Sequence, residues 1–379
     1  CFEKTSPLES GDVLYYNAPN GRQVLDMKRA MIAMSGGVDS SVAAFLCKEA
    51  GYDCMGMTMR LYNNEDVGID SKTCCSLDDV EDARSVAFRL GIPFQVFNFT
   101  DAFRSCVIHR FVVAYERGET PNPCIDCNKY LKFGQIFQRM DELGYEYVVT
   151  GHYARIAEEH GRFLLKKGLD ESKDQSYVLY GLTQAQLART LFPLGGMTKD
   201  AARCIAEEQG FLNARKRDSQ DICFVPDGDY PGFIERYTGK TYPAGNFEDT
   251  EGNVLGTHKG IVRYTIGQRK GLGLALPCPM YVKEKDMARN TVILSTDEEL
   301  FSRSLNACDF NWSAFDCPSD SIRCEAKIRY KHAQQPATVT PTGPGTAHIE
   351  FDTPQRAICK GQSVVLYDGD TVLGGGTIL

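Results

Sequence analysis

The chain lacks the long apolar runs that a membrane-spanning helix requires. No stretch approaches about 18 consecutive apolar residues, and the first residues, CFEKTSPLESGDV, contain no basic segment followed by an apolar leader. Internal repeats and low-complexity tracts are missing too, while 42% hydrophobic and 24% charged residues are ordinary for a globular protein. These features exclude a fibrous or disordered chain, and we expect a soluble, cytoplasmic protein with no membrane partner.

The chain also has no excess of positive charge. Its 42 lysines and arginines are outnumbered by 50 aspartates and glutamates, which gives a net charge of -8 at pH 7. Because phosphate contacts favour basic surfaces, this balance argues against a general nucleic-acid binder. Any RNA partner must therefore use local basic patches.

The cysteines do not form the dense, even set that marks a secreted disulfide scaffold. There are 15 of them, an odd number scattered over 379 residues, which is typical of thiols in a reducing compartment. Cys47 and Cys204 fall within helical apolar patterns. We expect both to be buried structural thiols.

Length and hydrophobic pattern together predict several domains. A chain of 379 residues exceeds what one hydrophobic core usually supports. As far as the segment YEYVVTGH, apolar strands alternate with amphipathic helices, which indicates a parallel sheet covered on both faces. We expect strands at residues 30–34, 52–61, 93–99 and 145–152, and helices around residues 42–46, 78–90, 102–117 and 130–143.

The sequence changes character after residue 218. Stretches such as YPAGNFEDTEGNV are rich in glycine and proline, as in a small, loop-rich module. From about residue 290, short alternating segments such as CEAKIRY and AHIEF predict a terminal all-β barrel or sandwich, and we take the barrel. The predicted fold class is α/β, with a parallel-sheet domain over residues 28–217, a central module over 218–289 and a β-barrel over 290–379.

The segment SGGVDSS joins a predicted strand to a predicted helix. Its two glycines let the backbone approach a ligand closely, and N–H groups at the helix start then point at an anion such as pyrophosphate. Three serines add hydroxyl groups, and Asp39 is placed to orient a metal ion or to cap the helix. The alternative is a tight turn with an N-cap serine. No lysine follows the glycines, so a kinase-type loop is not predicted.

This segment resembles the PP-loop of the N-type ATP pyrophosphatases. The resemblance implies an enzyme that adenylates a carbonyl oxygen and releases pyrophosphate. Amidotransferases, synthetases and tRNA sulfurtransferases share the loop, so the loop alone does not choose a substrate. In a parallel sheet, ligands bind outside the carboxyl ends of the strands. Three segments are expected at that edge: SGGVDS, TPNPCIDCN and TGHY. We expect TPNPCIDCN to be a loop.

Five further segments narrow the family. TPNPCIDCNKYLKF, TGHYARI, KDQSYVLYGL, DSQDICF and GQRKGLG resemble, in order, the tRNA 2-thiouridylases of the MnmA family, over nearly the whole chain from about Lys28 to Leu379. The resemblance implies an ATP- and Mg²⁺-dependent enzyme that thiolates the wobble uridine of tRNA through an adenylated intermediate. It also implies a persulfide-donating relay protein or cysteine desulfurase as partner. We expect a monomer.

Sulfur transfer needs one thiolate that carries a persulfide and a second thiol that expels the sulfur. The resemblance places these roles on Cys127 and Cys223, and which thiol takes which role stays open. Some family members have an acidic residue where this chain has Cys124. Three cysteines can hold a [4Fe-4S] cluster with one open iron, so a cluster on Cys124, Cys127 and Cys223 competes with the persulfide route and with a zinc site.

The resemblance also assigns ligand contacts. ATP is expected at Ala33, Met34, Ser35, Gly36, Gly37, Val38, Asp39, Ser40, Met59 and Gly151. For Met59, simple hydrophobic packing is the alternative to an adenine contact. The tRNA is expected at Asn122, Pro123, Cys124, His152, Lys173, Asp174, Gln175, Arg329, Tyr330 and Gln362. A uridine must leave its stack to be modified, so PNPCIDC is expected to enclose it.

Basic groups recur near these segments. They are Arg215, Lys216 and Arg217, then Arg269 and Lys270, then Lys327, Arg329 and Lys331. Strand alternation would put the last three on one face as a phosphate-tracking ridge, while solvated surface charge is the ordinary meaning of such runs.

Two other functions fit parts of the sequence. A PP-loop synthetase acting on a small metabolite would need neither paired thiols nor an RNA-sized surface. A catalytically idle tRNA-binding protein would have no need of the loop residues and both cysteines together.

Overall fold

The structure is a computed structural model that describes residues 27–62, 77–216 and 222–379. Arg217, one of the predicted basic groups, lies outside these ranges. Among the residues described, no helix combines the length and the apolarity needed to cross a membrane.

A five-stranded parallel sheet forms the first part of the molecule, with strand order β3-β2-β1-β4-β7. Each strand predicted in this region is confirmed, and the two-residue edge strand β7 is additional. The short apolar segments fit a sheet that is buried on both faces. The bounds are β1 Arg29–Ala33, β2 Asp53–Arg60, β3 Phe94–Asn98, β4 Tyr147–Val149 and β7 Thr190–Leu191.

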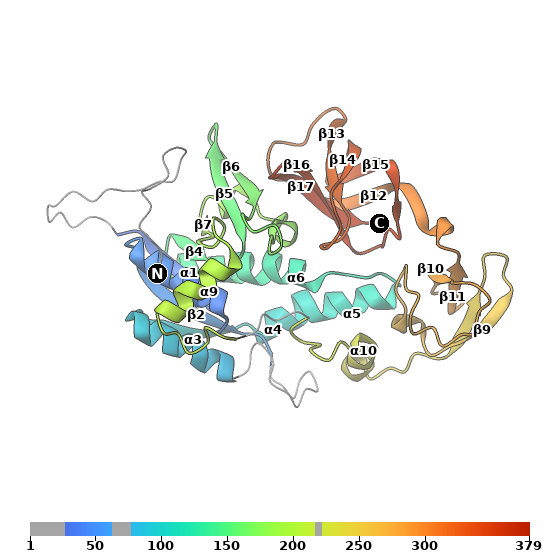
Figure 1. The fold of residues 1–379 in the computed structure, drawn as a ribbon, viewed down its shortest axis with the longest axis horizontal. Coiled ribbons are helices and arrows are strands. Elements are labelled where there is room, and N and C mark those ends of the chain that lie inside the picture. Colours follow the sequence, from blue (N-terminus) through green and yellow to red (C-terminus); the bar gives the residue numbers. More distant parts are fainter. Residues whose placement is uncertain (1–26, 63–76, 217–221) are drawn as a thin grey trace, which may run out of the picture.

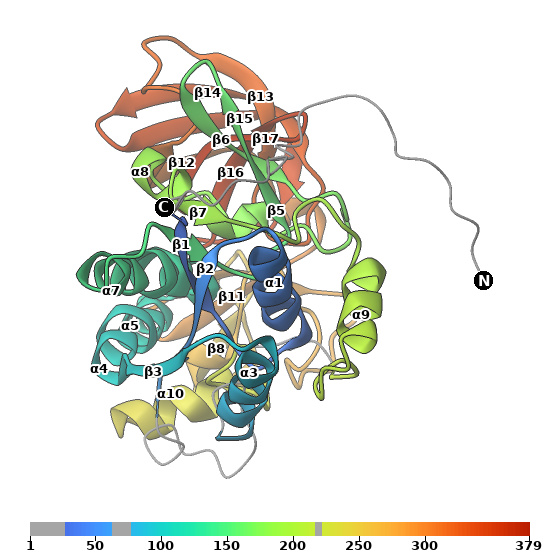
Figure 2. The same ribbon diagram turned by 90° about the vertical axis from the view of Figure 1, so that its left-hand side faces the viewer.

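Helices cover both faces of this sheet, as predicted (Figure 2). On one face Ile32 and Val149 pack against helices α1, α3 and α9, and on the other Met31 and Val148 pack against the helices that follow β3. The first layer consists of α1 Val38–Glu49, α3 Leu77–Leu90 and α9 Lys199–Glu208. The second contains α4 Thr100–Phe103, the π-helical η1 Arg104–Ile108, α5 His109–Glu116 and α7 Ile136–Glu142.

The helix that ends in α7 begins earlier than predicted. It starts with α6, Pro123–Asp126, and continues through the π-helical η2, Cys127–Gln135. The Asn122 side chain accepts a hydrogen bond from the Cys124 N–H at 3.1 Å, and a proline suits the first helical position because its missing N–H costs nothing there. The prediction that all of TPNPCIDCN is a loop is therefore wrong from Pro123 onward.

The central module is built on a small sheet of order β10-β11-β8-β9. Phe247, Val282, Val292 and Leu294 are fully buried in its core. The predicted boundary at residues 289 and 290 falls inside the β10–β11 hairpin. The elements are α10 Tyr230–Thr238, β8 Gly245–Glu248, β9 Val254–His258, the 3-10 turn η4 Ile261–Arg263, β10 Tyr281–Asp286 and β11 Thr291–Ser295.

The C-terminal part is a barrel, as predicted (Figure 1). Six strands in the order β12-β15-β14-β13-β16-β17 close through the pairing of β12 with β17. They are preceded by the 3-10 turn η5 Glu298–Leu300. The strands are β12 Phe301–Trp312, β13 Ile322–Lys327, β14 Gln335–Gly343, β15 Thr346–Arg356, β16 Ser363–Asp368 and β17 Thr371–Ile378.

The barrel is joined to the first domain by a shared core. A hairpin of β5, Ala154–Glu159, and β6, Arg162–Lys167, leaves the first domain and pairs with β17. Beside it lie the 3-10 turn η3, Ser176–Leu179, and the short helix α8, Gln184–Leu187. Ile125 and Phe133 of the α6–η2 helix belong to the same buried cluster as Val365 and Tyr367 of the barrel.

The two structural cysteines give a mixed result. Cys47 is buried at 3% exposure, which confirms the prediction. Cys204 is exposed, so the prediction for it is wrong. The buried face of α9 contains Ala202 and Ala206, and Cys204 lies between them in sequence, on another face of the helix.

Candidate functional site

The loop between β1 and α1 has a backbone shape that only glycine adopts easily. Gly36 has a φ of +74°, and a Cβ there would lie 2.3 Å from the carbonyl oxygen of Asp79. Gly37 is the N-cap residue of α1. The loop therefore packs directly on the start of α3, and the first N–H groups of α1, which have no partner within the helix, lie beside it.

Hydroxyl groups brace the loop from within. The Ser40 hydroxyl accepts a hydrogen bond from the Ser35 N–H at 3.1 Å and donates to the Gly37 carbonyl at 3.1 Å. Ser41 donates to the same carbonyl at 3.0 Å. A glycine cradle held rigid at the N-terminus of a twelve-residue helix fits the pyrophosphate part of a nucleotide.

The carboxylate of Asp39 is held by two groups from other segments. Lys199 donates to both carboxylate oxygens, at 2.7 and 2.8 Å, and the Tyr153 hydroxyl donates at 2.8 Å. Lys199 is only 5% exposed. No side chain caps α1, so the capping alternative for Asp39 is wrong, and its metal-orienting role stays a prediction.

The loop after β4 is packed against the predicted nucleotide loop, Ser35 to Ser40. A Cβ on Gly151 would lie 2.7 Å from the carbonyl carbon of Asp39 and 2.8 Å from the Ser40 nitrogen. The structure thus brings Gly151 to the predicted ATP loop. Met59 packs, with Ala33, against the core on the far face of the sheet from α1. This supports hydrophobic packing as a role for Met59, and its adenine contact stays a prediction.

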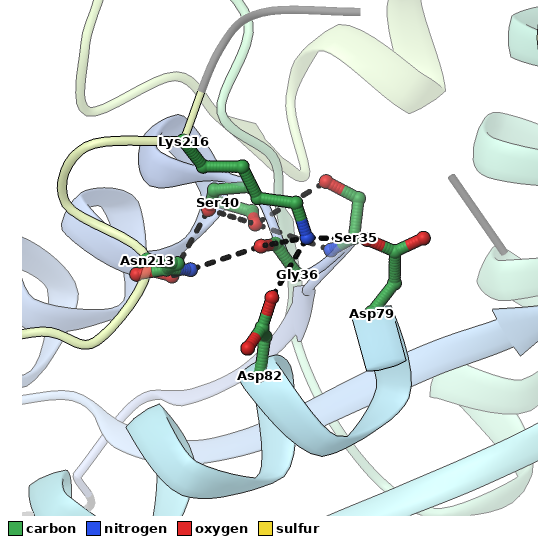
Figure 3. A network of polar contacts seen from close by, with 9 residues as sticks. Ser35, Gly36, Ser40, Asp79, Asp82, Asn213 and Lys216 are labelled. Atoms are coloured by element: carbon green, nitrogen blue, oxygen red, sulfur yellow. Dashed lines mark hydrogen bonds and ion pairs between the residues drawn. The ribbon is translucent and has the colours of Figure 1, made fainter. Parts of the chain in front are cut away.

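Lys216, which was predicted to belong to a basic patch for RNA, lies behind the loop from Ser35 to Ser40 (Figure 3). The Lys216 ammonium forms ion pairs with Asp79 and Asp82 of α3 and lies 3.4 Å from the Gly36 carbonyl oxygen. Asn213 donates to that same oxygen at 3.0 Å. No local sequence pattern indicates this network, because its members come from three separate segments.

Cys223 is held by an aromatic cluster. Phe224, which follows it, is 1% exposed and its ring lies 5.7 Å from Phe103 and 5.3 Å from Phe111, centroid to centroid. The hydroxyl of Tyr62, a buried residue just after β2, donates to the Cys223 carbonyl at 2.8 Å. These contacts attach the Cys223 segment to the carboxyl end of β2.

Cys127 begins the π-helical stretch and is half-buried. Cys127 and Cys223 both pack against the hydrophobic cluster that Ala33 and Met59 also contact. Beside Cys127, burial raises the pKa of the Asp126 carboxyl, although an ion pair with Arg110 at 3.4 Å opposes that shift. The structure therefore brings both predicted sulfur-handling cysteines to the layer that covers one face of the parallel sheet.

The described part of the chain contains no group of three or more His, Cys, Asp or Glu side chains arranged to hold a metal ion. Cys124, Cys127 and Cys223 all lie within that part. Their sulfur atoms are thus not assembled as a cluster or zinc site, and this donor arrangement does not fit either alternative.

Several predicted tRNA contacts gather around the start of α6. The Tyr330 hydroxyl donates to the Asp174 carbonyl at 2.9 Å, and the pKa of Tyr330 is raised chiefly by burial, with smaller effects of Asp174 and exposed Cys124. Gln362 donates to the carbonyl of Thr120, just before Asn122, at 2.6 Å. These groups come from the first domain and from the barrel.

Gln175 and Lys173 lie on the segment that leads from this region to the nucleotide loop. The side chain of Gln175 accepts a hydrogen bond from the Tyr153 N–H at 3.0 Å, and the Tyr153 hydroxyl in turn binds Asp39. Lys173 follows Asp170 in a turn closed by a 3.0 Å backbone hydrogen bond.

Two predicted tRNA residues are directed into the protein. His152 is 7% exposed and packs near the rings of Phe133 and Phe192. Its Nδ1 forms a hydrogen bond with the Thr150 hydroxyl at 2.7 Å. Burial holds the pKa of His152 well below the usual value. Arg329 donates to the Ala357 carbonyl at 2.6 Å. Neither side chain lies on an open surface.

The predicted basic ridge of Lys327, Arg329 and Lys331 is wrong. Strand β13 ends at Lys327, and the residues that follow form a bend, so the three side chains do not alternate along one strand. Lys327 itself lies over the rings of Tyr177 and Tyr330.

Comparisons with known proteins cover nearly the whole chain. Residues 28–227 match the tRNA methyl transferase HUP domain family, residues 231–296 the tRNA methyl transferase PRC-barrel domain and residues 302–378 the aminomethyltransferase beta-barrel domain. The tRNA-specific 2-thiouridylase MnmA of Clostridioides difficile is 50% identical over 353 residues, which is 93% of this chain and 98% of that protein. The protein of the same name from Clostridium acetobutylicum is 50% identical over 357 residues, 93% of this chain and 99% of its own.

Solved structures show more distant similarity. A 4-thiouridine synthetase in complex with RNA and bound ATP aligns with 56% of this chain and 50% of its own, with 18% identity and a TM-score of 0.31. The NMN synthetase from Francisella tularensis aligns with 57% of this chain and 79% of its own, with 14% identity and a TM-score of 0.33.

Proposed function

Because this chain belongs to the MnmA family of tRNA-specific 2-thiouridylases, we propose that it uses ATP to replace the position-2 oxygen of the wobble uridine of tRNA with sulfur. The proposal is supported most by one arrangement. A rigid pyrophosphate cradle at the start of α1 and two cysteines from distant segments, Cys127 and Cys223, are attached to the same sheet.

The first step is activation of the uridine. The cradle from Ser35 to Ser40, with Gly151 against it, binds the phosphates of ATP through N–H groups at the start of α1. The uridine oxygen attacks the α-phosphorus, pyrophosphate leaves, and the oxygen becomes part of a good leaving group. Mg²⁺ that accompanies ATP neutralises phosphate charge when it is bound.

The second step moves sulfur. A persulfide-donating protein loads Cys223, and the Cys127 thiolate attacks the Cys223 sulfur. The sulfur–sulfur bond of the persulfide breaks, and the outer sulfur leaves with the electron pair as hydrosulfide. It attacks carbon 2 of the uridine, AMP leaves with the oxygen, and the proton on sulfur is lost. The cysteines end as a disulfide, which an external thiol must reduce before the next turnover.

The tRNA is proposed to lie across the start of α6. Cys124 is exposed and Asn122 half-buried there, while Pro123 between them is buried. Asp174, Tyr330 and Gln362 lie close by. This surface uses residues from the first domain and the barrel, which suits a folded RNA better than a small metabolite. We also propose that the chain works as a cytoplasmic monomer of three domains.

The test is release of AMP and pyrophosphate by the purified protein, measured with and without tRNA. We expect pyrophosphate release only with tRNA, and AMP together with 2-thiouridine when a persulfide source is also present. Release with a small amide acceptor alone would identify a metabolite synthetase, and tight tRNA binding without turnover would identify an idle binder.

The same reconstitution separates the sulfur routes. Anaerobically purified protein is assayed for iron and for thiolation. Iron-free protein that thiolates tRNA supports the persulfide route, and activity that requires bound iron would contradict it. The variant Cys124→Ser removes one cluster ligand and leaves the proposed pair intact, so we expect it to keep sulfur transfer.

A further inference from the structure

Two donors meet at a single backbone oxygen on the rear of the nucleotide loop. The Gly36 carbonyl accepts a hydrogen bond from Asn213 at 3.0 Å and lies 3.4 Å from the Lys216 ammonium (Figure 3). Asn213 is 4% exposed and also donates to the Ser41 hydroxyl at 2.9 Å. The segment from Asn213 to Lys216 is therefore fixed against the loop and not merely near it.

This oxygen belongs to the peptide unit whose N–H is that of Gly37, the N-cap residue of α1. Hydrogen bonds polarise one another along a chain, so donors at a carbonyl make the N–H of the same peptide a stronger donor. A cation at the carbonyl does so more strongly than a neutral group. The N–H at the helix start is one of the groups expected to face the phosphates.

The lysine is held in place by charge. Asp79 is 5% exposed, and its carboxylate and that of Asp82 both form ion pairs with Lys216. Burial lowers the pKa of Lys216, but hydrogen bonds and charge from the two aspartates outweigh that effect, so its pKa is raised. The ammonium is thus charged at neutral pH and is held by two carboxylates, one of which is buried.

We propose that Lys216 is a positioning residue for the phosphates of ATP. From behind the loop it polarises the Gly36–Gly37 peptide and so strengthens the binding of the phosphates. The inference rests on the proposed ATP-binding role of this loop. It gives the basic segment before Cys223 a task in nucleotide binding in place of the RNA contact expected from sequence.

The experiment compares the binding of ATP, pyrophosphate and adenosine by titration calorimetry. The variant Asp79→Asn/Lys216→Met removes the lysine charge together with the charge of its buried ion-pair partner. We expect about tenfold weaker binding of ATP and pyrophosphate, with adenosine unaffected, because only the phosphates contact the polarised amide. Arg215→Met, at the neighbouring exposed position, serves as the matched control and should bind all three ligands like the parent protein.

A purely structural role would weaken all three ligands together or none of them, and either outcome overturns the inference. The variant Asp82→Asn gives an independent test should the double variant not fold. It removes one counter-charge and keeps the lysine, so ATP and pyrophosphate should bind about two- to threefold more tightly. Unchanged or weaker binding by this variant would also overturn the inference. If the parent protein binds neither ATP nor pyrophosphate, the proposed function itself fails.

Discussion

Gly36 combines two restrictions at one residue. Its left-handed backbone disfavours any side chain, and its close approach to Asp79 leaves no room for a Cβ. Gly51 has a similar φ, +85°, but nothing lies within 4 Å of a Cβ built there. Substitutions at both positions therefore strain the backbone, but only one at Gly36 also causes a steric clash.

We predict that Gly51→Ala costs about 1 kcal/mol of unfolding free energy through backbone strain alone. Gly36→Ala should cost roughly 1–3 kcal/mol more, because the loop must shift away from α3. Urea denaturation measures the stability, and calorimetry with pyrophosphate measures binding. Only Gly36→Ala should lose pyrophosphate binding, and equal effects of the two variants would contradict the account of the loop.

Burial of His152 makes the stability of the folded protein depend on pH. Burial holds its pKa well below the usual value of about 6.5. Between the two values the unfolded chain binds a proton and the folded protein does not, so stability rises with pH. The contribution of His152 is complete above about pH 6.5 and is lost as the pH falls below it.

The predicted slope from this residue is about 1.4 kcal/mol of unfolding free energy per pH unit below pH 6.5. Urea denaturation at several pH values measures it. His152→Gln should flatten the slope by that amount, while His160→Gln, in the exposed turn between β5 and β6, should leave it unchanged. Equal slopes for His152→Gln and the parent protein would mean that His152 is not buried as a neutral imidazole.

Single residues were predictable where the chemistry is local. The sequence SGGVDSS identifies the loop because glycines between a strand and a helix have a restricted set of uses. Lys199, Asn213 and Lys216 were missed as loop contacts, because each reaches the loop from a distant segment and no local pattern records that. Cys204 was placed wrongly because an apolar pattern on one helix does not fix which residues face the core.

At the scale of elements, the start of α6 controls where Cys124 and Cys127 lie. The Asn122 side chain caps this helix. We predict that Asn122→Ala costs about 1 kcal/mol of unfolding free energy, whereas Asn122→Asp keeps the cap and stays close to the parent protein. Urea denaturation tests the stability, and single-turnover thiolation tests the position of the cysteines.

A matched cap variant tests whether this effect is local. Thr183→Ala removes the capping box of α8, which carries neither cysteine. It should cost a similar amount of stability without slowing thiolation. If Asn122→Ala slows thiolation no more than Thr183→Ala does, the cap of α6 does not position the cysteines.

The strands and helices of the first domain could be predicted because their apolar periods are regular. Asn122 followed by Pro123 is also a helix-start signal, and it was outweighed by the two prolines of the segment, which favour a loop. The strand assigned to KIRYK was extended too far because alternation alone does not show where pairing with β14 and β16 stops.

At the scale of the whole molecule, the barrel docks on the connection that leads into α6. Gly361 has a φ of +84°, and a Cβ there would lie 2.9 Å from the Glu119 Cβ and 3.2 Å from the Thr120 nitrogen. Gly369, in the same barrel, has a φ of +58° and nothing within 4 Å. Both glycines have a left-handed backbone, but only Gly361 contacts the segment that leads into α6.

We predict that Gly361→Ala weakens tRNA binding about tenfold, because the barrel must move away from the start of α6. ATP binding should be unchanged. Gly369→Ala is the control and should bind both ligands normally. Filter binding with labelled tRNA measures the first effect, and a normal tRNA affinity for Gly361→Ala would contradict a shared tRNA surface between barrel and helix.

The order of domains could be predicted because each has its own sequence character. The packing of the domains on one another could not be predicted. Ile125 and Phe133, which join the first domain to the barrel, cannot be told by sequence from apolar residues that face the core of their own domain. The strand β11 pairs with both β8 and β10, a long-range arrangement that alternation near residue 290 does not indicate.

The most direct test of the account follows the two cysteines through one turnover. Enzyme loaded with persulfide is mixed with ATP and tRNA, quenched, and analysed by mass spectrometry of its peptides and of the tRNA nucleosides. The account predicts that a disulfide between Cys127 and Cys223 appears in step with 2-thiouridine, at one disulfide per modified base. Accumulation of 2-thiouridine while both cysteines stay as thiols would contradict it.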